Sequence, residues 1–180
     1  MIPILQKRRA CCGWLALALL LLPLSAHSAT RYVWSNGSGS SPYNSWGTAA
    51  KSIQAALTGS TAGDLILVTN GTYTSAVANV AFVTNGIRLR SVNGPGFTII
   101  DGANTRRCLV VSNTAAGAFI SGFTLTRGYR GGLTDHGGAV SMSQGMISNC
   151  IISANQAVGY GGGIYATAGT ITHCIITNNT

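Results

Sequence analysis

The sequence predicts an all-β solenoid, a parallel β-helix with a short N-terminal capping helix. Two observations lead to this fold class. Residues 145–155 return as residues 169–179 at a constant offset of 24, and apolar residues stand in runs of three to five between Gly, Asn and Ser. A repeat of this period is typical of solenoids, and such short runs favour strands over helices.

The aligned repeats predict which side chains stack on one another. Each strand of such a coil pairs with its equivalent one turn away, so equivalent positions form ladders along the axis. Residues 120–126 match the same register, and alternation along the strands then predicts two inward ladders and an asparagine ladder. These ladders are Phe123 with Cys150 and Cys174, Leu125 with Ile152 and Ile176, and Asn155 with Asn179. A third row, Ile120 with Ile147 and Ile171, points inward only if the chain bends at Gly122.

Three β-rich runs between residues 65 and 100 predict the first, less regular coils. They are separated by Asn70-Gly71, Asn85-Gly86 and Asn93-Gly94, and Asn-Gly pairs are typical of turns between strands. Residues 65–180 divided by the 24-residue period predict roughly five coils.

The N-terminal residues predict export followed by a cap. Residues 1–29 combine a basic start, an apolar run and small residues, as a secretory signal peptide does, and the run is short for a membrane anchor. We therefore expect an extracellular, cell-surface or outer-membrane location and no transmembrane helix in the mature chain. Residues 30–64 are predicted to close the first coil with an amphipathic helix at 45–58.

The other end predicts continuation rather than closure. The chain stops at Thr180 just after a predicted strand and without a capping element, so we expect a truncated C-terminus and further coils of the same protein. Removing the predicted signal peptide lowers the formal charge from +8 to +5 and leaves Cys108, Cys150 and Cys174. An odd number of cysteines argues against a disulfide framework.

The motifs resemble a known group of proteins. Residues 43–46 leading into 53–56, followed by 62–68 and 71–73, resemble the amino-terminal coils of secreted bacterial right-handed parallel β-helix proteins of the pectin-lyase-like superfamily. The Gly-Gly elements at 137–140 and 162–165, at an offset of 25, and the elements ending in Asn155 and Asn179 resemble polymorphic outer membrane protein repeats, with Ile in the aromatic place. This resemblance implies a right-handed fold and an exported protein, and it is compatible with enzymes, adhesins and structural proteins.

Catalytic candidates are few, because the chain contains three acidic residues. Asp64 and Asp101 stand in Gly-Asp and Asp-Gly turns, where the carboxylate favours turn formation. Asp135 and His136 form the weak catalytic candidate, since a carboxylate beside an imidazole can activate water; the alternative is a polar loop before a strand. No metal-binding or cofactor-binding motif is present, so we expect no metal and no cofactor.

Basic residues predict binding of an acidic polysaccharide or of cell-surface components, and not of nucleic acid. If stacking aligns them, the arginines form a basic stripe with a tyrosine available for a sugar ring; the alternative is scattered solvated arginines. These residues are Arg88, Arg90, Arg106, Arg107, Arg127, Tyr129 and Arg130. The sequence thus predicts the N-terminal part of a non-catalytic, exported β-helix stalk or adhesin-like surface protein. The alternative is a polysaccharide lyase or glycoside hydrolase whose catalytic residues lie beyond residue 180.

Overall fold

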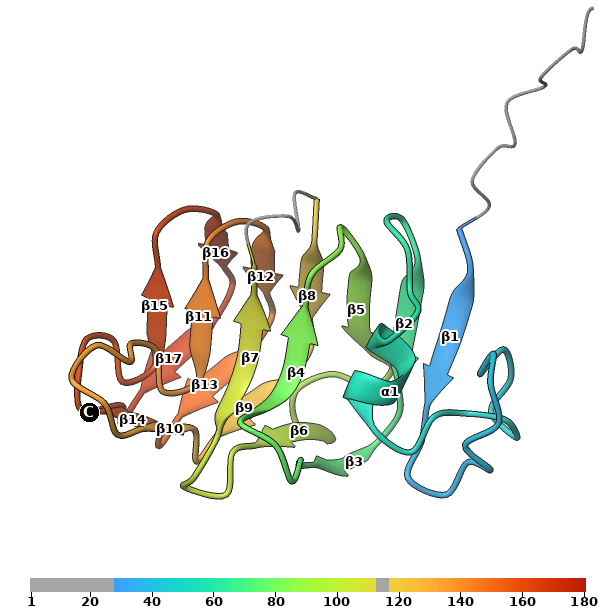
Figure 1. Ribbon diagram of the computed structural model, residues 1–180, viewed down its shortest axis with the longest axis horizontal. Coiled ribbons are helices and arrows are strands. Elements are labelled where there is room, and N and C mark those ends of the chain that lie inside the picture. The colour runs from blue at the N-terminus through green and yellow to red at the C-terminus, as the bar shows by residue number, and fades with distance from the viewer. Residues whose placement is uncertain (1–27, 113–116) are drawn as a thin grey trace, which may run out of the picture.

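The computed structural model describes residues 28–112 and 117–180, so the predicted signal peptide lies almost entirely outside the described residues. The described chain is a right-handed parallel β-helix of about four turns, drawn with its long axis horizontal in Figure 1. Every strand pairing is parallel. The fold class predicted from the repeat is confirmed.

Among the described residues, three long sheets run along the axis, and each of the four complete turns contributes one strand to each of them. Sheet A contains β1 (Thr30–Val33), β2 (Leu65–Val68), β5 (Arg88–Ser91), β8 (Phe119–Ser121), β12 (Met146–Ser148) and β16 (Thr170–Thr172). Sheet B contains β3 (Gly71–Tyr73), β6 (Thr98–Asp101), β9 (Thr124–Thr126), β13 (Ile151–Ser153) and β17 (Ile175–Thr177). Sheet C contains β4 (Asn79–Val83), β7 (Arg107–Val111), β11 (Val140–Met142) and β15 (Ile164–Ala166), and β10 (Tyr129–Arg130) pairs with β14 (Gln156–Ala157).

Two of the middle turns are longer than the repeat, which explains why about four turns replace the predicted five. Along sheet A, Arg88 follows its partner Leu65 by 23 residues, but Phe119 follows Arg88 by 31. Met146 follows Phe119 by 27, and only the last step, to Thr170, has the 24 residues of the sequence repeat. The 24-residue period therefore describes the last turn and is shorter than the two turns before it.

The interior is formed by ladders of apolar side chains. Ile152 pairs with Leu125 on one side and with Ile176 on the other. Ile147 pairs in the same way with Ile120 and Ile171. This second row points inward because the chain bends between sheets A and B at a left-handed residue in each turn, namely Gly122 at φ +85°, Asn149 at φ +50° and His173 at φ +52°.

Cys108, Cys150 and Cys174 are free thiols. Cys108 and Cys150 are buried, and burial raises the pKa of each to about 12. A protonated, inaccessible thiol is a poor nucleophile, so these cysteines serve as small apolar core residues. Cys174 is half-buried in the last turn, and Phe123 is fully buried one turn before Cys150.

The asparagine positions form a hydrogen-bonded stack. The buried Asn155 amide donates from Nδ2 to Asn179 Oδ1 at 2.8 Å and to the carbonyls of Leu125 and Ser153 at 3.0 Å each. Its Oδ1 accepts the Gly128 amide at 2.7 Å. One side chain thus satisfies backbone groups from two successive turns at a corner where the strands end.

A helix covers the first turn, but it is shorter than predicted. Helix α1 (Ile53–Leu57) has five residues, and the predicted helix at 45–58 is not confirmed. Ser52 is extended and its side chain accepts the Ala55 amide, so it caps the helix and prevents an earlier start. Before it, Ser45 and Thr48 exchange backbone-to-side-chain hydrogen bonds and form a turn.

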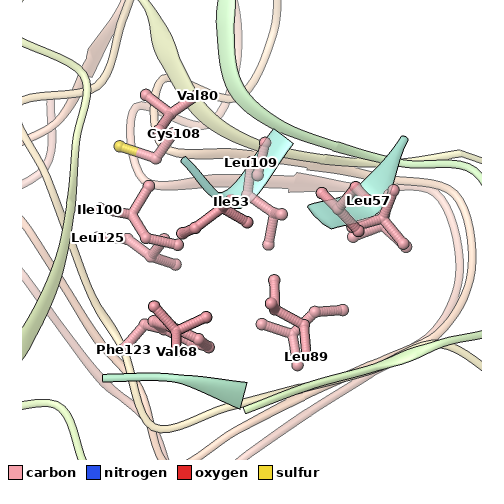
Figure 2. Close-up of a cluster of buried hydrophobic side chains, with 14 of the residues drawn as sticks. Ile53, Leu57, Val68, Val80, Leu89, Ile100, Cys108, Leu109, Phe123 and Leu125 are labelled. Atoms are coloured by element: carbon pink, nitrogen blue, oxygen red, sulfur yellow. The ribbon is translucent and has the colours of Figure 1, made fainter. Parts of the chain in front are cut away.

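This short helix nevertheless contributes to the core. Ile53 and Leu57 project into the same interior as Leu89 and Leu109 from sheets A and C (Figure 2). Gln54 Oε1 accepts the amide of Phe82 at 2.8 Å, which satisfies a backbone group of β4, the edge strand of sheet C. Strand β1, predicted as part of the cap, is the first strand of sheet A.

Candidate functional site

Two of the three carboxylates hold turns of the backbone. Buried Asp64 accepts the amides of Ala29 at 2.8 Å and Thr61 at 2.9 Å, and the Nε of Arg31 lies 3.6 Å from it. Burial raises the pKa of Asp64, but these hydrogen bonds and the Arg31 charge outweigh it and leave the pKa below its ordinary value.

Asp101 likewise stabilises a backbone turn, at the end of β6. Its Oδ1 accepts the Ala103 amide at 2.8 Å and Arg127 Nε at 3.0 Å, and its Oδ2 pairs with Arg127 Nη2. Burial again raises the pKa, and the hydrogen bonds from Arg127 and Ala103 lower it further than burial raises it. Both aspartates are therefore ionised structural groups, which leaves Asp135 as the remaining acid.

The loop between β10 and β11 contains the catalytic candidate of the sequence, Asp135 and His136. His136 Nδ1 accepts the amide of Tyr160 at 2.9 Å, so this nitrogen carries no proton. The exposed Asp135 donates its own amide to the Gly132 carbonyl. His136 thus contacts a residue one turn away, whereas the backbone hydrogen bond of Asp135 stays within its own loop.

Aromatic rings surround this imidazole. The ring centre of His136 lies 4.9 Å from that of Tyr160 and 4.7 Å from that of Tyr165, with both tyrosine rings tilted by about the same angle, 44° and 43°. Tyr160 is 73% exposed. We call Asp135, His136, Tyr160 and Tyr165 the His136 corner; Tyr165 belongs to β15, and the other three lie in the loops that precede β11 and β15.

The two tyrosines were missed in the sequence because the Gly-Gly elements were aligned one residue out of step. Val140 pairs with Ile164, and the Gly137 amide donates to the Tyr160 carbonyl, so the offset is 24 and not 25. At an offset of 24, His136 and Tyr160 are equivalent positions. That alignment is the sequence signal that could have found Tyr160.

A shallow groove extends from this corner across the outer face of sheet C. Its volume is about 340 Å³, and it is lined by Val110, Ser141, Ser143, Tyr165 and Thr167 among others. Ser141 lies between Val110 and Tyr165 in the register of the sheet. The groove therefore offers one aromatic ring with hydroxyl groups beside it.

Arg107 stabilises the backbone of the His136 corner through side-chain hydrogen bonds. It is 8% exposed, and its Nε and Nη2 donate to the carbonyls of Gly137 at 2.8 Å and His136 at 2.6 Å. Burial, together with the nearby charge of Arg130, lowers the pKa of Arg107 to about 10, and Asp135 opposes this shift. This arginine is a structural residue and is not available to a ligand.

The other predicted arginines do not form one row. Arg88 and Arg90 are exposed on β5, but their partners in the next turn are Phe119 and Ser121. Arg127 is paired with Asp101, and Arg106 donates to its neighbour Thr105. Tyr129 and Arg130 are half-buried on β10, where Arg130 donates to Asn79 at 3.0 Å. Arg88 and Arg90 are therefore an exposed pair on sheet A. The other four arginines of the predicted stripe, and Tyr129, do not lie in the same row.

Within residues 28–112 and 117–180, no three His, Cys, Asp or Glu side chains are grouped so that they could share a metal ion. Across the same residues, no helix combines the length and apolar character that a membrane crossing requires. No known protein family, curated protein or solved structure matches the chain. The class of protein is therefore defined by its fold alone, a parallel β-solenoid.

Proposed function

We propose that this chain belongs to an exported, non-catalytic β-helix protein that acts as a stalk or adhesin-like scaffold at the cell surface or outer membrane. The resemblance to pectin-lyase-like and polymorphic outer membrane proteins is part of this proposal. Its function is display: the turns hold exposed side chains at fixed spacing on a rigid surface.

The use of the carboxylates is the observation that supports a non-catalytic function. Hydrolysis of a glycosidic bond ordinarily requires two carboxyl groups, one acid and one base or nucleophile, facing the same bond. Here Asp64 and Asp101 are both buried and hydrogen-bonded to backbone amides. Asp135 lies on the surface of a different loop.

The charge of the surface supports an anionic ligand. Arg88 and Arg90 alternate with buried Leu89 and Ser91, so both guanidinium groups leave β5 on the same outer face of sheet A. Two exposed guanidinium groups on one strand face can each pair with a carboxylate of the same polyuronate chain. Acidic polysaccharide is therefore the proposed ligand class.

Binding and cleavage can be measured on the same sample. We expect the protein to be retained on immobilised polygalacturonate, with retention decreasing as NaCl screens the charges, and to release no reducing ends or unsaturated products. Arg90→Ser should reduce retention more than Lys51→Ser, which removes the same charge from an exposed residue elsewhere. Equal effects of the two substitutions would contradict the ligand proposal.

Product release from the polymer would contradict the non-catalytic proposal and support a lyase or hydrolase. Export is tested separately, by fusing residues 1–29 to a reporter enzyme that is active only outside the cytoplasm. An inactive fusion, alongside an active control with an established signal peptide, would contradict the proposed location.

A further inference from the structure

A second groove lies next to β1, which stands at the opposite end of sheet A from β16 (Figure 1). It has a volume of about 270 Å³ and is lined by Trp34, Trp46 and Thr69. Trp46 is 37% exposed although it is the largest kind of apolar side chain. An exposed indole in a groove is apolar surface that a ligand can remove from water.

The backbone fixes the walls of this groove. Trp34 follows β1 directly, donates its amide to the Ala50 carbonyl at 2.9 Å and accepts the Gly37 amide at 3.0 Å. The Thr69 amide donates to the Val33 carbonyl at 3.1 Å, which ties the third wall to the residue before Trp34. These hydrogen bonds fix the backbone of Trp34 and of Thr69 in the unliganded protein.

Trp46 is held from two sides. The hydrogen bonds between Ser45 and Thr48 form the turn that carries it. The ring of Tyr32 meets the indole edge-on, with ring centres 4.6 Å apart and planes at 63°. A ligand that binds here orders little of the protein, so less of the interaction energy is lost on binding.

The residues that line the groove favour an uncharged ligand with an apolar face. None of the three lining residues is charged, and the one polar side chain is the Thr69 hydroxyl. The volume lies just below the roughly 300–1000 Å³ of sites for drug-sized ligands, which suits a single ring. A pyranose has an apolar C–H face that stacks on an indole and hydroxyl groups at its edge that hydrogen-bond to a hydroxyl.

A cationic ligand is less suited to the groove. Two indoles can attract an ammonium group through their π faces. However, no carboxylate lines the groove, and the chain has a formal net charge of +8 that disfavours the approach of cations. We propose that the Trp34–Trp46 groove binds one uncharged sugar ring of a glycan, independently of the arginine pair on sheet A.

Tryptophan fluorescence reports directly on this groove. The chain has three tryptophans, and Trp14→Phe leaves only Trp34 and Trp46 as emitters. In that background we expect methyl glucoside, methyl galactoside or methyl mannoside to change the emission saturably, with a Kd on the order of 1 mM. The Kd should be insensitive to NaCl, because an uncharged ligand is not screened.

Matched variants assign the signal. Trp46→Ala should weaken binding by at least about tenfold, while Phe97→Ala, which removes a 60% exposed aromatic ring from another part of the surface, should leave the Kd unchanged. Should Trp46→Ala alter the far-ultraviolet circular dichroism, the indole N–H resonances of the folded Trp14→Phe protein are followed instead. The indole N–H resonances of Trp34 and Trp46 should both shift as a glycoside is added.

Two results would overturn the assignment. One is the lack of any saturable change with the three glycosides up to about a hundredfold above the expected Kd. The other is a saturable change with tetramethylammonium but not with the glycosides, which would make the groove a cation site. Neither result bears on retention by polygalacturonate, so this groove and the proposed function fail separately.

Discussion

At the scale of single residues, two of the three acidic side chains hold the backbone at the ends of strands. Asp64 accepts two amides where the first full turn begins, and Asp101 accepts one amide and the Arg127 guanidinium where β6 ends. Because hydrogen bonds to the ionised form lower the pKa of both groups below the ordinary value of 3.8, ionisation favours the folded chain.

This linkage predicts acid sensitivity with a definite sign. The pKa of each aspartate is lower when the chain is folded, so its stabilisation is fully present above pH 3.8 and is lost as the pH falls through the folded pKa. We expect the urea midpoint to decrease as the pH is lowered from 5 to about 2. In the double variant Asp64→Asn with Asp101→Asn the decrease should be smaller than in Asp135→Asn, whose exposed carboxyl serves as the control. A pH profile identical in all three proteins would contradict this account.

At the scale of elements, the corners between strands depend on close backbone approach. Gly128 lies between β9 and β10, and a Cβ atom there would collide with the Gly138 carbonyl oxygen and lie 2.8 Å from both Ala139 Cα and Asn155 Oδ1. Asn155 Oδ1 is also the atom that accepts the hydrogen bond from the Gly128 amide. The asparagine stack and the adjoining turn can therefore approach each other only because this residue has no side chain.

Substitution of this glycine should be costly for a steric reason. We expect Gly128→Ala to lower the free energy of unfolding by about 2 kcal/mol or more, since the turn and the Asn155 amide must both move. Gly96→Ala is the matched control, because a Cβ atom there meets nothing within 4 Å, and its effect should stay below about 1 kcal/mol. Urea unfolding followed by circular dichroism measures both, and similar losses would contradict the steric explanation.

At the scale of the whole molecule, each turn is stabilised by its neighbours along the axis. Ile152 lies between Leu125 and Ile176 and is fully buried, whereas Ile176 is 52% exposed because no further strand covers β17 in the part of the chain that the structure describes. Equal residues at equivalent positions thus differ in burial according to their place along the solenoid.

This difference predicts unequal costs for the same substitution. Ile152→Ala should lower the free energy of unfolding by about 2–5 kcal/mol, as loss of a buried aliphatic side chain does. Ile176→Ala should cost less than about 1 kcal/mol, because its side chain already contacts water. Both values come from urea unfolding of the purified chain, and a larger loss for Ile176→Ala would mean that the last turn is covered in solution.

The ladders were accessible to sequence reasoning because alternation and a fixed offset are properties of the chain itself. Leu125, Ile152 and Ile176 could be placed in register from residues 120–126 and the 24-residue repeat. The start of the helix could be predicted only in part from the sequence. Ala49 continues the apolar face of the helical pattern, but Ser52 and the turn at Ser45 confine the helix to five residues.

The site was less accessible, because it depends on which residues of successive turns meet. Three consecutive glycines, Gly161 to Gly163, allow the Gly-Gly element to be aligned in two ways. Backbone hydrogen bonds select the offset of 24 and bring Tyr160 onto His136. The arginines show the same limit, since Arg88 meets Phe119 and not another arginine.

The sequence by itself determined the fold class and the identity of the inward ladders, since repetition forces equivalent residues to stack in any parallel solenoid. Only the tertiary structure decided how many turns the described chain makes, where the aromatic rings gather and which charges are already paired. Those outcomes depend on the lengths of irregular turns and on contacts between residues about 20 to 50 positions apart, such as Arg127 with Asp101 and Arg130 with Asn79. Local sequence patterns do not specify such contacts, whereas backbone hydrogen bonding between turns does.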